Sequence, residues 1–349
     1  MLQSAASPNQ GIASKLVDRL SALERWLETR VPPGGYALAP ASADASFRRY
    51  FRVTFPHTSQ PSVIAMDAPP EKEDSRPFVR VAGLMAAAGL HVPSILAQDL
   101  EQGFLLLSDL GTRTYLGALD ESNADALFRD ALDAIVKWQR ATVPDALPPY
   151  DAALLRRELD LFPEWYVSRH VGVSIDTADR EMLERVFALL IAAATAQPQV
   201  FVHRDFMPRN LMVSEPNPGV LDFQDAVIGP ITYDVVSLFR DAFISWPEER
   251  VLDWTIRYWE NARGAGLPLA TDFADFWRDF EWMGLQRHLK VLGIFARINY
   301  RDGKPGYLED TPRFVGYARA VAARYSPLAP LLPLFDRLEN RAARAGYTF

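Results

Sequence analysis

Three short oxygen-bearing side chains are the residues of this 349-residue chain whose types and spacing could do chemistry. Asp205 and Asn210 lie in one polar segment, and Asp222 follows twelve residues after Asn210. Carboxylate and amide oxygens are ligands that Mg²⁺ prefers, and this ion usually takes only one or two carboxylates from a protein. A carboxylate can also orient an attacking hydroxyl group and accept its proton. The three residue types therefore suit phosphoryl transfer to an alcohol.

Short apolar runs around these residues predict the strands that position them. The runs 199–202 and 211–213 flank the first polar segment, and the run 219–221 leads into Asp222. Residues 216–219, Pro-Asn-Pro-Gly, predict a turn between the second run and the third. Because the polar residues then lie at neighbouring strand ends, we expect their side chains to converge. The alternative is a buried polar turn with ordinary Asn and Asp caps, but the joint spacing favours catalysis.

The same spacing resembles the catalytic loop and the metal-binding aspartate of protein kinases. The pattern is His-x-Asp-x-x-x-x-Asn, from His203 to Asn210, followed by Asp222. The resemblance implies that Asp205 is the catalytic base and that Asn210 and Asp222 bind Mg²⁺. It also implies that His203 holds the loop in shape.

Composition and charge indicate an ordinary globular protein of two lobes. The length exceeds that of a typical single domain, and 49% hydrophobic with 23% charged residues is typical of soluble chains. A net charge of −7 argues against nucleic acid as a partner, and the absence of cysteine excludes disulfides and thiolate chemistry. No apolar run reaches the roughly 18 residues of a membrane span, and a signal peptide is not evident. We therefore expect a cytoplasmic protein with no membrane partner; the sequence predicts no oligomeric state.

The first third of the chain predicts a helix followed by a small β-rich lobe. Leucines at helical spacing within 14–30 predict an amphipathic helix. A second helix is expected from Phe78, between the third and fourth strands. The expected strands are 36–39, 49–55, 62–66, 94–97 and 103–107. Residues 1–107 would form the nucleotide-binding lobe, 108–112 a hinge, and 113–349 the catalytic and substrate lobe.

Two polar segments of the small lobe are candidates for nucleotide binding. Segment 42–46 joins two strands, and a turn of small residues can offer backbone N–H groups and the Ser46 hydroxyl to phosphates. Segment 108–111 can offer backbone groups to an adenine edge. Ordinary turns are the alternative at both places. The residues assigned to the nucleotide are Ser46, Phe47, Arg49, Ser108, Asp109 and Leu110.

The rest of the chain predicts mainly helices outside the catalytic strands. Asn123 is expected to cap the first of them, and Pro163 must start, kink or end the second. The expected helical ranges are 154–168, 179–194, 234–244, 248–264, 270–298 and 311–325, with prolines 327, 330 and 333 interrupting the tail. The order predicts an α+β, protein-kinase-like fold of two lobes, a small β-rich one and a larger, mainly helical one, with a cleft between them.

Further motifs resemble the aminoglycoside phosphotransferase and choline kinase branch of the protein-kinase-like fold. They are 44–52, 66–71, 104–111, 221–225, 229–234 and 285–293, and they span nearly the whole chain. Within this branch the chain resembles bacterial sugar kinases of peptidoglycan recycling, which phosphorylate the anomeric (C1) hydroxyl of N-acetylmuramate and N-acetylglucosamine. The resemblance implies ATP and Mg²⁺ as cofactors and a small-molecule sugar as substrate. It gives Asp234 a structural role, capping the following helix and tying the loop together.

One departure from the kinase pattern bears on nucleotide affinity. Protein kinases place a Lys on the third strand, paired with a helix Glu, to hold phosphates. Here the third strand ends in Ala65-Met66-Asp67, and the helix 78–88 contains no Glu. The cations that could supply the missing charge are Arg48, Arg49, Arg52 and Lys72.

Candidates for sugar contacts lie on segments that would face the cleft in such folds. An aromatic plate beside carboxylates suits a sugar ring, although aromatic residues at helical spacing are also typical of a core. The candidates are Glu158, Trp165, Asp225 and Arg301. His288, in an apolar helix, is expected to be a core residue rather than a ligand.

Three other functions fit the same residues. The chain could phosphorylate an aminoglycoside or an amino alcohol, and a dense acidic cleft wall would mark such a cationic substrate. It could be a non-catalytic nucleotide-binding module, which the missing Lys favours and the three intact catalytic residues oppose. It could be a metal-dependent phosphatase, which would not need the β-rich lobe with its hinge.

Overall fold

The computed structural model describes residues 8–32, 35–42, 47–56, 59 and 61–345. Contacts divide the chain into two compact units. The small unit comprises Met1–Gly83 and Val92–Gly111, and the large unit comprises Leu84–His91 and Thr112–Phe349. The division after Gly111 falls inside the segment 108–112.

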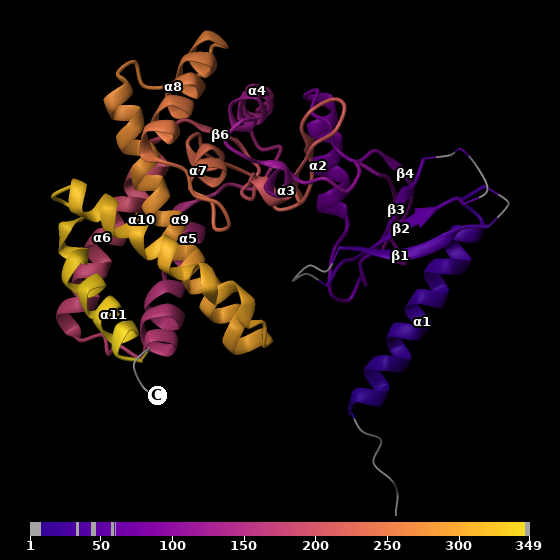
Figure 1. The fold of residues 1–349 in the computed structure, drawn as a ribbon, viewed down its shortest axis with the longest axis horizontal. Coiled ribbons are helices and arrows are strands. Elements are labelled where there is room, and N and C mark those ends of the chain that lie inside the picture. Colours follow the sequence, from indigo (N-terminus) through magenta and orange to yellow (C-terminus); the bar gives the residue numbers. More distant parts are fainter. Residues whose placement is uncertain (1–7, 33–34, 43–46, 57–58, 60, 346–349) are drawn as a thin grey trace, which may run out of the picture. The chain divides into compact units, whose positions relative to one another are not determined.

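The small unit is a five-stranded antiparallel sheet with one long helix packed against it (Figure 1). The strands, in the order β1-β2-β3-β5-β4, are β1 (Ala37–Ser42), β2 (Arg49–Thr54), β3 (Val63–Asp67), β5 (Phe104–Ser108) and β4 (Ile95–Asp99). Helix α1 (Pro8–Glu28) buries Leu23, Trp26 and Leu27 in one apolar cluster with Val53 and Phe104 of the sheet. The five predicted strands and their covering helix are confirmed.

The large unit is mainly helical (Figure 1). Its α-helices, after α2 (Arg76–Ala87), which runs across the division, are α3 (Tyr115–Ala118), α4 (Ala124–Arg140), α5 (Ala152–Leu159), α6 (Thr177–Ala196), α7 (Tyr233–Phe239), α8 (Glu248–Gly264), α9 (Phe273–Asp302), α10 (Thr311–Arg324) and α11 (Leu332–Ala345). Together with the small sheet, this bears out the predicted α+β fold. No helix in the described part of the chain is long and apolar enough to cross a membrane.

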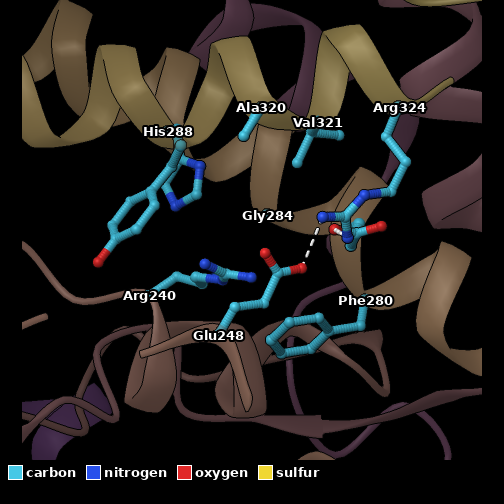
Figure 2. A pocket seen from close by; sticks show the side chains of 10 residues that line it. Arg240, Glu248, Phe280, Gly284, His288, Ala320, Val321 and Arg324 are labelled. Atoms are coloured by element: carbon cyan, nitrogen blue, oxygen red, sulfur yellow. Dashed lines mark hydrogen bonds and ion pairs between the residues drawn. The ribbon is translucent and has the colours of Figure 1, made fainter. Parts of the chain in front are cut away.

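Helix α9 is the centre of the large unit. Sixteen of its thirty residues are buried, among them four consecutive positions, 286–289, that carry polar as well as apolar side chains. Its neighbours include α6, α10 and a π-helix (Phe162–Val171). Figure 2 shows Gly284 and His288 of α9 facing Ala320 and Val321 of α10. The expected placement of His288 in the core is confirmed, and burial lowers the pKa of His288 well below its ordinary value.

Two short antiparallel ladders carry the catalytic segments of the large unit. Strand β6 (Gln199–Val202) pairs with β9 (Val227–Pro230), and β7 (Leu211–Met212) pairs with β8 (Gly219–Val220). A 3₁₀ turn (Pro208–Asn210) precedes β7 directly. The first, second and third apolar runs flanking the polar residues are therefore strands, as predicted, whereas β9 was not predicted.

Several local predictions need correction. The Asn123 side chain makes no capping bond to α4; its amide instead donates to the Ala118 carbonyl oxygen at 2.8 Å and its oxygen accepts from the Asp120 N–H at 3.0 Å, closing the preceding turn. Pro163, by contrast, starts the π-helix, which is one of the predicted alternatives, and in its first turn a missing N–H is tolerated. Pro333 lies at the second residue of α11, so the tail that we expected to be interrupted forms one more helix.

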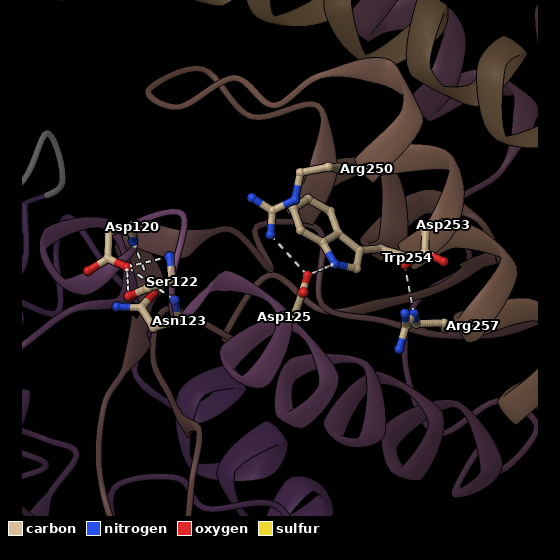
Figure 3. A network of polar contacts seen from close by, with 8 residues as sticks. All are labelled: Asp120, Ser122, Asn123, Asp125, Arg250, Asp253, Trp254 and Arg257. Carbon is tan, nitrogen blue, oxygen red and sulfur yellow. Dashed lines mark hydrogen bonds and ion pairs between the residues drawn. The ribbon is translucent and has the colours of Figure 1, made fainter.

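One polar contact shows how α8 is fixed on α4 (Figure 3). Asp125, in the first turn of α4, accepts hydrogen bonds from Arg250 at 3.0 Å and from the Trp254 indole at 2.8 Å. Trp254 is itself buried beneath this contact. These polar contacts therefore lie beside the buried aromatic packing between the two helices.

Candidate active site

A carboxylate from α7 holds the loop between His203 and Asn210. Asp234 accepts hydrogen bonds from the backbone N–H groups of His203 (2.8 Å) and Arg204 (3.0 Å). The φ of Arg204 is 76°, a left-handed conformation that is costly for a residue with a Cβ atom, and these bonds hold it in place. Burial is the largest cause that raises the pKa of Asp234 to about 6, although His203 and both N–H groups act in the opposite direction. The carboxylate ties the loop and does not cap α7, contrary to the cap that we expected.

His203 joins this loop to the strand that precedes Asp222. Its Nδ1 accepts a hydrogen bond from the Asp205 N–H at 3.2 Å, and its Nε2 lies 3.0 Å from the carbonyl oxygen of Leu221. Because a carbonyl oxygen can only accept, Nε2 carries the proton and the ring is neutral. Burial lowers the pKa of His203, which favours the same neutral form. The ring is therefore a fixed spacer between the two catalytic segments.

The structure brings Asp205, Asn210 and Asp222 together. The amide nitrogen of Asn210 donates to the carbonyl oxygen of Asp205 at 3.0 Å and to Oδ2 of Asp222 at 3.3 Å. Gln224 donates to Oδ1 of Asp222 at 2.9 Å. Asp222 has a φ of 62°, a second left-handed position in this site. These bonds use the nitrogen of the Asn210 amide and not its oxygen.

The donor set of Asn210 and Asp222 fits a hard divalent cation. An amide oxygen and a carboxylate are oxygen ligands, and Mg²⁺ normally completes its shell with phosphate oxygens and water. In the described part of the chain no group of three or more His, Cys, Asp or Glu side chains could hold a metal ion.

A pocket of about 120 Å³ in the large unit opens beside Asp205. Aromatic side chains form much of its wall, namely Phe243, Phe295, Tyr307 and Phe314. The charged residues that line it are Asp205, Arg209, Arg287 and Lys290. An apolar wall, one carboxylate and three cations therefore meet in one concave site.

Glu158 lies behind this pocket in a buried network of charges. One carboxylate oxygen lies 2.6 Å from Nη2 of Arg204 and 3.0 Å from Nζ of Lys290, and the other accepts from the Tyr150 hydroxyl. Lys290 also donates to the Tyr233 hydroxyl at 2.9 Å. Both oxygens of Glu158 are thus engaged by protein groups. The structure places this sugar-contact candidate in the support of the loop and not on the pocket wall.

The other predicted sugar contacts also lie outside the lining of this pocket. Trp165 is half-buried against the helical core, with the Arg169 guanidinium 4.9 Å from its ring. Arg301 is exposed and paired with its neighbour Asp302 at 2.7 Å. Asp225 is exposed on the loop after Asp222. None of these three residues, nor Glu158, lines the pocket that contains Asp205.

Arg287 and Lys290 line this pocket, although neither was predicted from the sequence. Both lie in the 285–293 segment of α9, which carries part of the family resemblance. Two cations three residues apart, inside a helical segment that is otherwise largely apolar, are an unusual pattern because isolated buried charges are costly. That pattern is the signal that could have identified them.

The nucleotide candidates lie in the small unit. Ser46 is outside the described residues. Phe47 is 61% exposed, and Lys72 Nζ lies 5.4 Å from its ring. Arg49 binds Asp67 through its guanidinium, with Nε at 3.1 Å from the carboxylate.

Ser108 is the last residue of β5, Asp109 and Leu110 follow it, and all three are partly buried. The Asp109 carboxylate accepts from Arg52 at 2.6 Å, from Ser62 at 2.7 Å and from the Gly111 N–H at 2.9 Å. Because that side chain is already engaged, a nucleotide base could be bound here only by backbone groups, as the sequence suggested.

Three of the four cations considered for the missing lysine, Arg48, Arg49 and Arg52, are paired with protein carboxylates. Asp67, at the end of β3, is fully buried and forms ion pairs with Arg49 and with Arg19 of α1. Arg48 pairs with Glu73 at 3.1 Å. The third strand thus carries an acid where kinases carry a lysine, and this acid gathers arginines from two other elements.

A second hollow in the large unit, of about 20 Å³, contains none of the candidate catalytic residues (Figure 2). Arg324 closes it by binding Glu248 at 2.6 Å and Glu281 at 2.5 Å. Its charges are therefore largely paired with one another, and the pocket beside Asp205 is the better candidate site.

Comparison with solved structures defines the class of protein. An aminoglycoside phosphotransferase with bound ADP superposes with a TM-score of 0.57 at 14% identity, covering 85% of this chain and 97% of that one. A choline kinase from Cryptosporidium parvum superposes with a TM-score of 0.59 at 12% identity, covering 88% and 95%. At these identities the likeness shows the fold alone, which is the protein-kinase-like fold of small-molecule phosphotransferases.

Sequence comparison places the chain more narrowly. The model of the phosphotransferase enzyme family matches residues 37–277. An N-acetylmuramate/N-acetylglucosamine kinase from Pseudomonas aeruginosa is 58% identical over 319 residues, covering 91% of this chain and 92% of that protein. A protein of the same name from Neisseria meningitidis is 48% identical, covering 94% and 98%. The chain belongs to the phosphotransferase enzyme family, and it is an enzyme of the kinase type.

Proposed function

We propose that this enzyme transfers the γ-phosphoryl group of ATP to the anomeric (C1) hydroxyl of N-acetylmuramate and N-acetylglucosamine. The observation that carries the proposal is Asp205, a carboxylate on the wall of the pocket, in the same loop as Asn210, whose amide nitrogen binds both the Asp205 backbone oxygen and the Asp222 carboxylate. The names of the relatives at 48% and 58% identity support the choice of sugars. Solved relatives with bound ADP, or with bound ATP and streptomycin, support the nucleotide.

In the proposed step, the C1 hydroxyl oxygen forms a bond to the γ-phosphorus. The bond between that phosphorus and the bridging oxygen of the β-phosphate breaks, and ADP leaves with the electron pair. Asp205 orients the hydroxyl group and accepts its proton. The products are the sugar 1-phosphate, ADP and the proton that Asp205 later releases to water.

Asn210 and Asp222 are proposed to hold Mg²⁺. When bound there, this ion would neutralise negative charge that builds up on the phosphate oxygens. The chain's own contribution is to fix these two ligands. Gln224 and the Asn210 amide nitrogen hold the Asp222 carboxylate from both sides, while His203 and Asp234 hold the loop.

The small unit is proposed as the nucleotide-binding lobe, with segment 108–112 as its hinge. Backbone groups of Ser108, Asp109 and Leu110 would meet the adenine. Phe47 and Arg49, together with Ser46, would lie toward the phosphates. The partial exposure of Arg49, 29% for its side chain, supports this because its charge can still reach a ligand.

The charges of the pocket favour a sugar over the other acceptors considered. An aminoglycoside or amino alcohol is cationic and calls for an acidic wall. The pocket instead has three cations and a single carboxylate, Asp205. We further propose that the reaction belongs to peptidoglycan recycling and takes place in the cytoplasm, where ATP is available.

The test is an assay of ADP formation with ATP and Mg²⁺ on a panel of N-acetyl sugars and amino alcohols, with the phosphate position read by NMR. We expect phosphate on C1 of the two N-acetyl sugars. Asp205→Asn should lower turnover by about 10²- to 10⁴-fold, the usual effect of losing a general base. Phosphate on C6 would overturn the C1 assignment, and near-normal turnover of the variant would remove Asp205 from the mechanism.

A further inference from the structure

We infer that Arg287 is the residue that binds the carboxylate of an acidic sugar acceptor, and so distinguishes N-acetylmuramate from N-acetylglucosamine. This inference rests on the proposed function, because it concerns the acceptor of the same reaction. The two sugars differ by a lactyl ether that carries one carboxylate. A single guanidinium in the acceptor pocket can therefore separate them.

The first support is that Arg287 is buried and, in the described structure, makes no direct bond to a protein carboxylate. The residue is 3% exposed, and its Nη1 has no hydrogen-bond partner. Among the residues that the structure describes, its side chain forms no hydrogen bond and no ion pair. Buried charges in proteins are normally paired, because an unpaired one is costly. An unpaired buried guanidinium on a pocket wall is what a site for an anionic ligand group requires.

The second support is the arrangement of α9 along the pocket. Arg287, Lys290, Val291 and Ile294 lie at helical spacings of three and four residues, so they share one face of the helix. This face is cationic at its first end and apolar further along. Asp205 and the aromatic wall belong to the same pocket. One ligand that carries a hydroxyl group, an apolar face and an anion would match all three parts.

The neighbouring charges leave Arg287 as the cation for this role. Lys290 is ion-paired with Glu158 at 3.0 Å, and Arg209 has its guanidinium 5.1 Å from the Phe243 ring. Asp241 is a buried acidic residue that interacts electrostatically with Arg287, but its carboxylate accepts a hydrogen bond from the Phe243 N–H at 3.3 Å and none from Arg287. No ion pair links Asp241 to Arg287 in the described structure.

The chemistry of the group favours a carboxylate. A guanidinium is planar and always charged, and its fork of N–H groups matches both oxygens of a carboxylate. A phosphate of the nucleotide is the other anion that could reach such a group. These two sources differ in their consequences, because a phosphate is present with every acceptor and the lactyl carboxylate with only one.

The experiment measures binding and turnover of both sugars by Arg287→Met and Arg287→Lys in the full-length enzyme. Binding is followed by calorimetry with Mg²⁺ and a non-hydrolysable ATP analogue, so that it does not depend on catalysis. We expect Arg287→Met to weaken N-acetylmuramate binding and raise its KM by about 10- to 100-fold, the value of a charge-assisted pair. N-acetylglucosamine should change by less than about 3-fold by the same reasoning. Arg287→Lys should give an intermediate loss for the acidic sugar only.

Equal losses for both sugars, or weaker binding of the nucleotide analogue, would overturn the inference in favour of a phosphate contact. No loss for either sugar would overturn it as well. Asp241→Asn tests whether Arg287 has only a structural role. If Arg287 acted only through Asp241, then Asp241→Asn and Arg287→Met would have similar melting temperatures and similar KM values for both sugars. If the wild-type enzyme binds the sugars but transfers no phosphate, the proposed function fails while the selectivity of binding still decides the role of Arg287. Should Arg287→Met fail to fold, Arg287→Lys carries the same comparison.

Discussion

The Nζ atom of Lys290 on α9 lies 3.0 Å from a carboxylate oxygen of Glu158 on α5, with both residues only 7% exposed. The same oxygen binds Arg204, whose backbone begins the catalytic loop. One carboxylate therefore balances two cations and connects two helices to the loop that carries Asp205. Removing one member of such a buried network leaves uncompensated charge behind.

Glu158→Gln is expected to lower the free energy of unfolding by about 3–5 kcal/mol at neutral pH, the usual cost of breaking a buried ion pair. Urea denaturation followed by circular dichroism measures it. The control is Asp253→Asn, which breaks the exposed Asp253–Arg257 pair on α8 (Figure 3). An exposed pair contributes about 0–1 kcal/mol. Similar losses in both variants would show that the network contributes no more than a surface pair.

A separate prediction concerns how the difference in free energy of unfolding between wild type and Glu158→Gln depends on pH. Burial tends to raise the pKa of Glu158, but Lys290 and Arg204 outweigh it and the net pKa lies below 4.5, its ordinary value. The unfolded chain therefore binds this proton more readily than the folded chain. The stabilisation should be complete above the ordinary pKa and should be lost as the pH falls through the folded pKa. Denaturation of wild type and Glu158→Gln should be compared between about pH 3 and 8, which includes the range of carboxyl titration. The difference between their free energies of unfolding should disappear only at the acid end of this range.

Gly293→Ala should destabilise the large unit. A Cβ atom at Gly293 on α9 would lie 2.5 Å from the backbone carbon of Leu161, closer than real Cβ atoms approach. Because that neighbour is backbone, the helix or the 161 segment must shift, and we expect a loss of about 1–3 kcal/mol or more. Gly284→Ala on the same helix is the matched control, since its nearest contact would be an ordinary 3.6 Å. The control should be neutral or more stable by up to about 1 kcal/mol, because Ala is the better helix former. Thermal unfolding of both variants decides, and equal melting temperatures would contradict the packing argument.

Arg49→Gln should raise the KM for ATP by about 10-fold, the loss of one charge-assisted contact to phosphate. Arg49 and Arg19 bind the same buried carboxylate, Asp67, from β2 and from α1. Arg19→Gln is therefore a matched control, because it also removes an ion pair to Asp67 and Arg19 has no proposed contact with phosphate. Both variants should lose stability, but only Arg49→Gln should change the KM for ATP. If both raise KM alike, Arg49 acts through Asp67 and not on the nucleotide.

Local sequence predicted the parts of the fold that depend on local patterns. The strands beside Asp205 and Asp222 are short apolar runs with turn residues between them, so their positions follow from propensity. Strand β9 was missed because Val227–Pro230 is defined only by pairing with β6, a partner distant in sequence. Helix α11 was missed because proline was interpreted as an interruption, whereas Pro333 fits a first helical turn.

The same difference between local patterns and contacts of distant segments applies to the candidate site residues. His203, Asp205, Asn210 and Asp222 could be predicted as one group because they lie within one short stretch with fixed spacing, and their roles stay predictions. Glu158 was found as a charge but assigned to the wrong surroundings, since its partners Arg204 and Lys290 come from segments far along the chain. A pocket wall assembled from α9, α10 and two loops has no contiguous sequence pattern to reveal it.

Asp222→Asn should raise the Mg²⁺ concentration needed for half-maximal rate. The Asp222 carboxylate accepts from the amides of Asn210 and Gln224. An amide at this position loses the negative charge and turns an N–H group toward one of those donors. We expect an increase of about 10- to 100-fold in the half-saturating Mg²⁺ concentration, on the scale of lost metal-site interactions.

The measurement is the initial rate against Mg²⁺ concentration at fixed ATP, with Asn210→Ala as the second variant. Asn210→Ala should shift the same curve, because it removes the amide oxygen while leaving the Asp222 charge in place. Asp253→Asn on α8 again serves as the control, since it removes one carboxylate far from the loop and should leave the curve unchanged. If the Asp222 and Asn210 variants lower the maximal rate but keep the wild-type Mg²⁺ dependence, these residues shape the loop and do not bind the ion. A shift in both curves, absent from the control, would instead assign the metal to this pair of side chains.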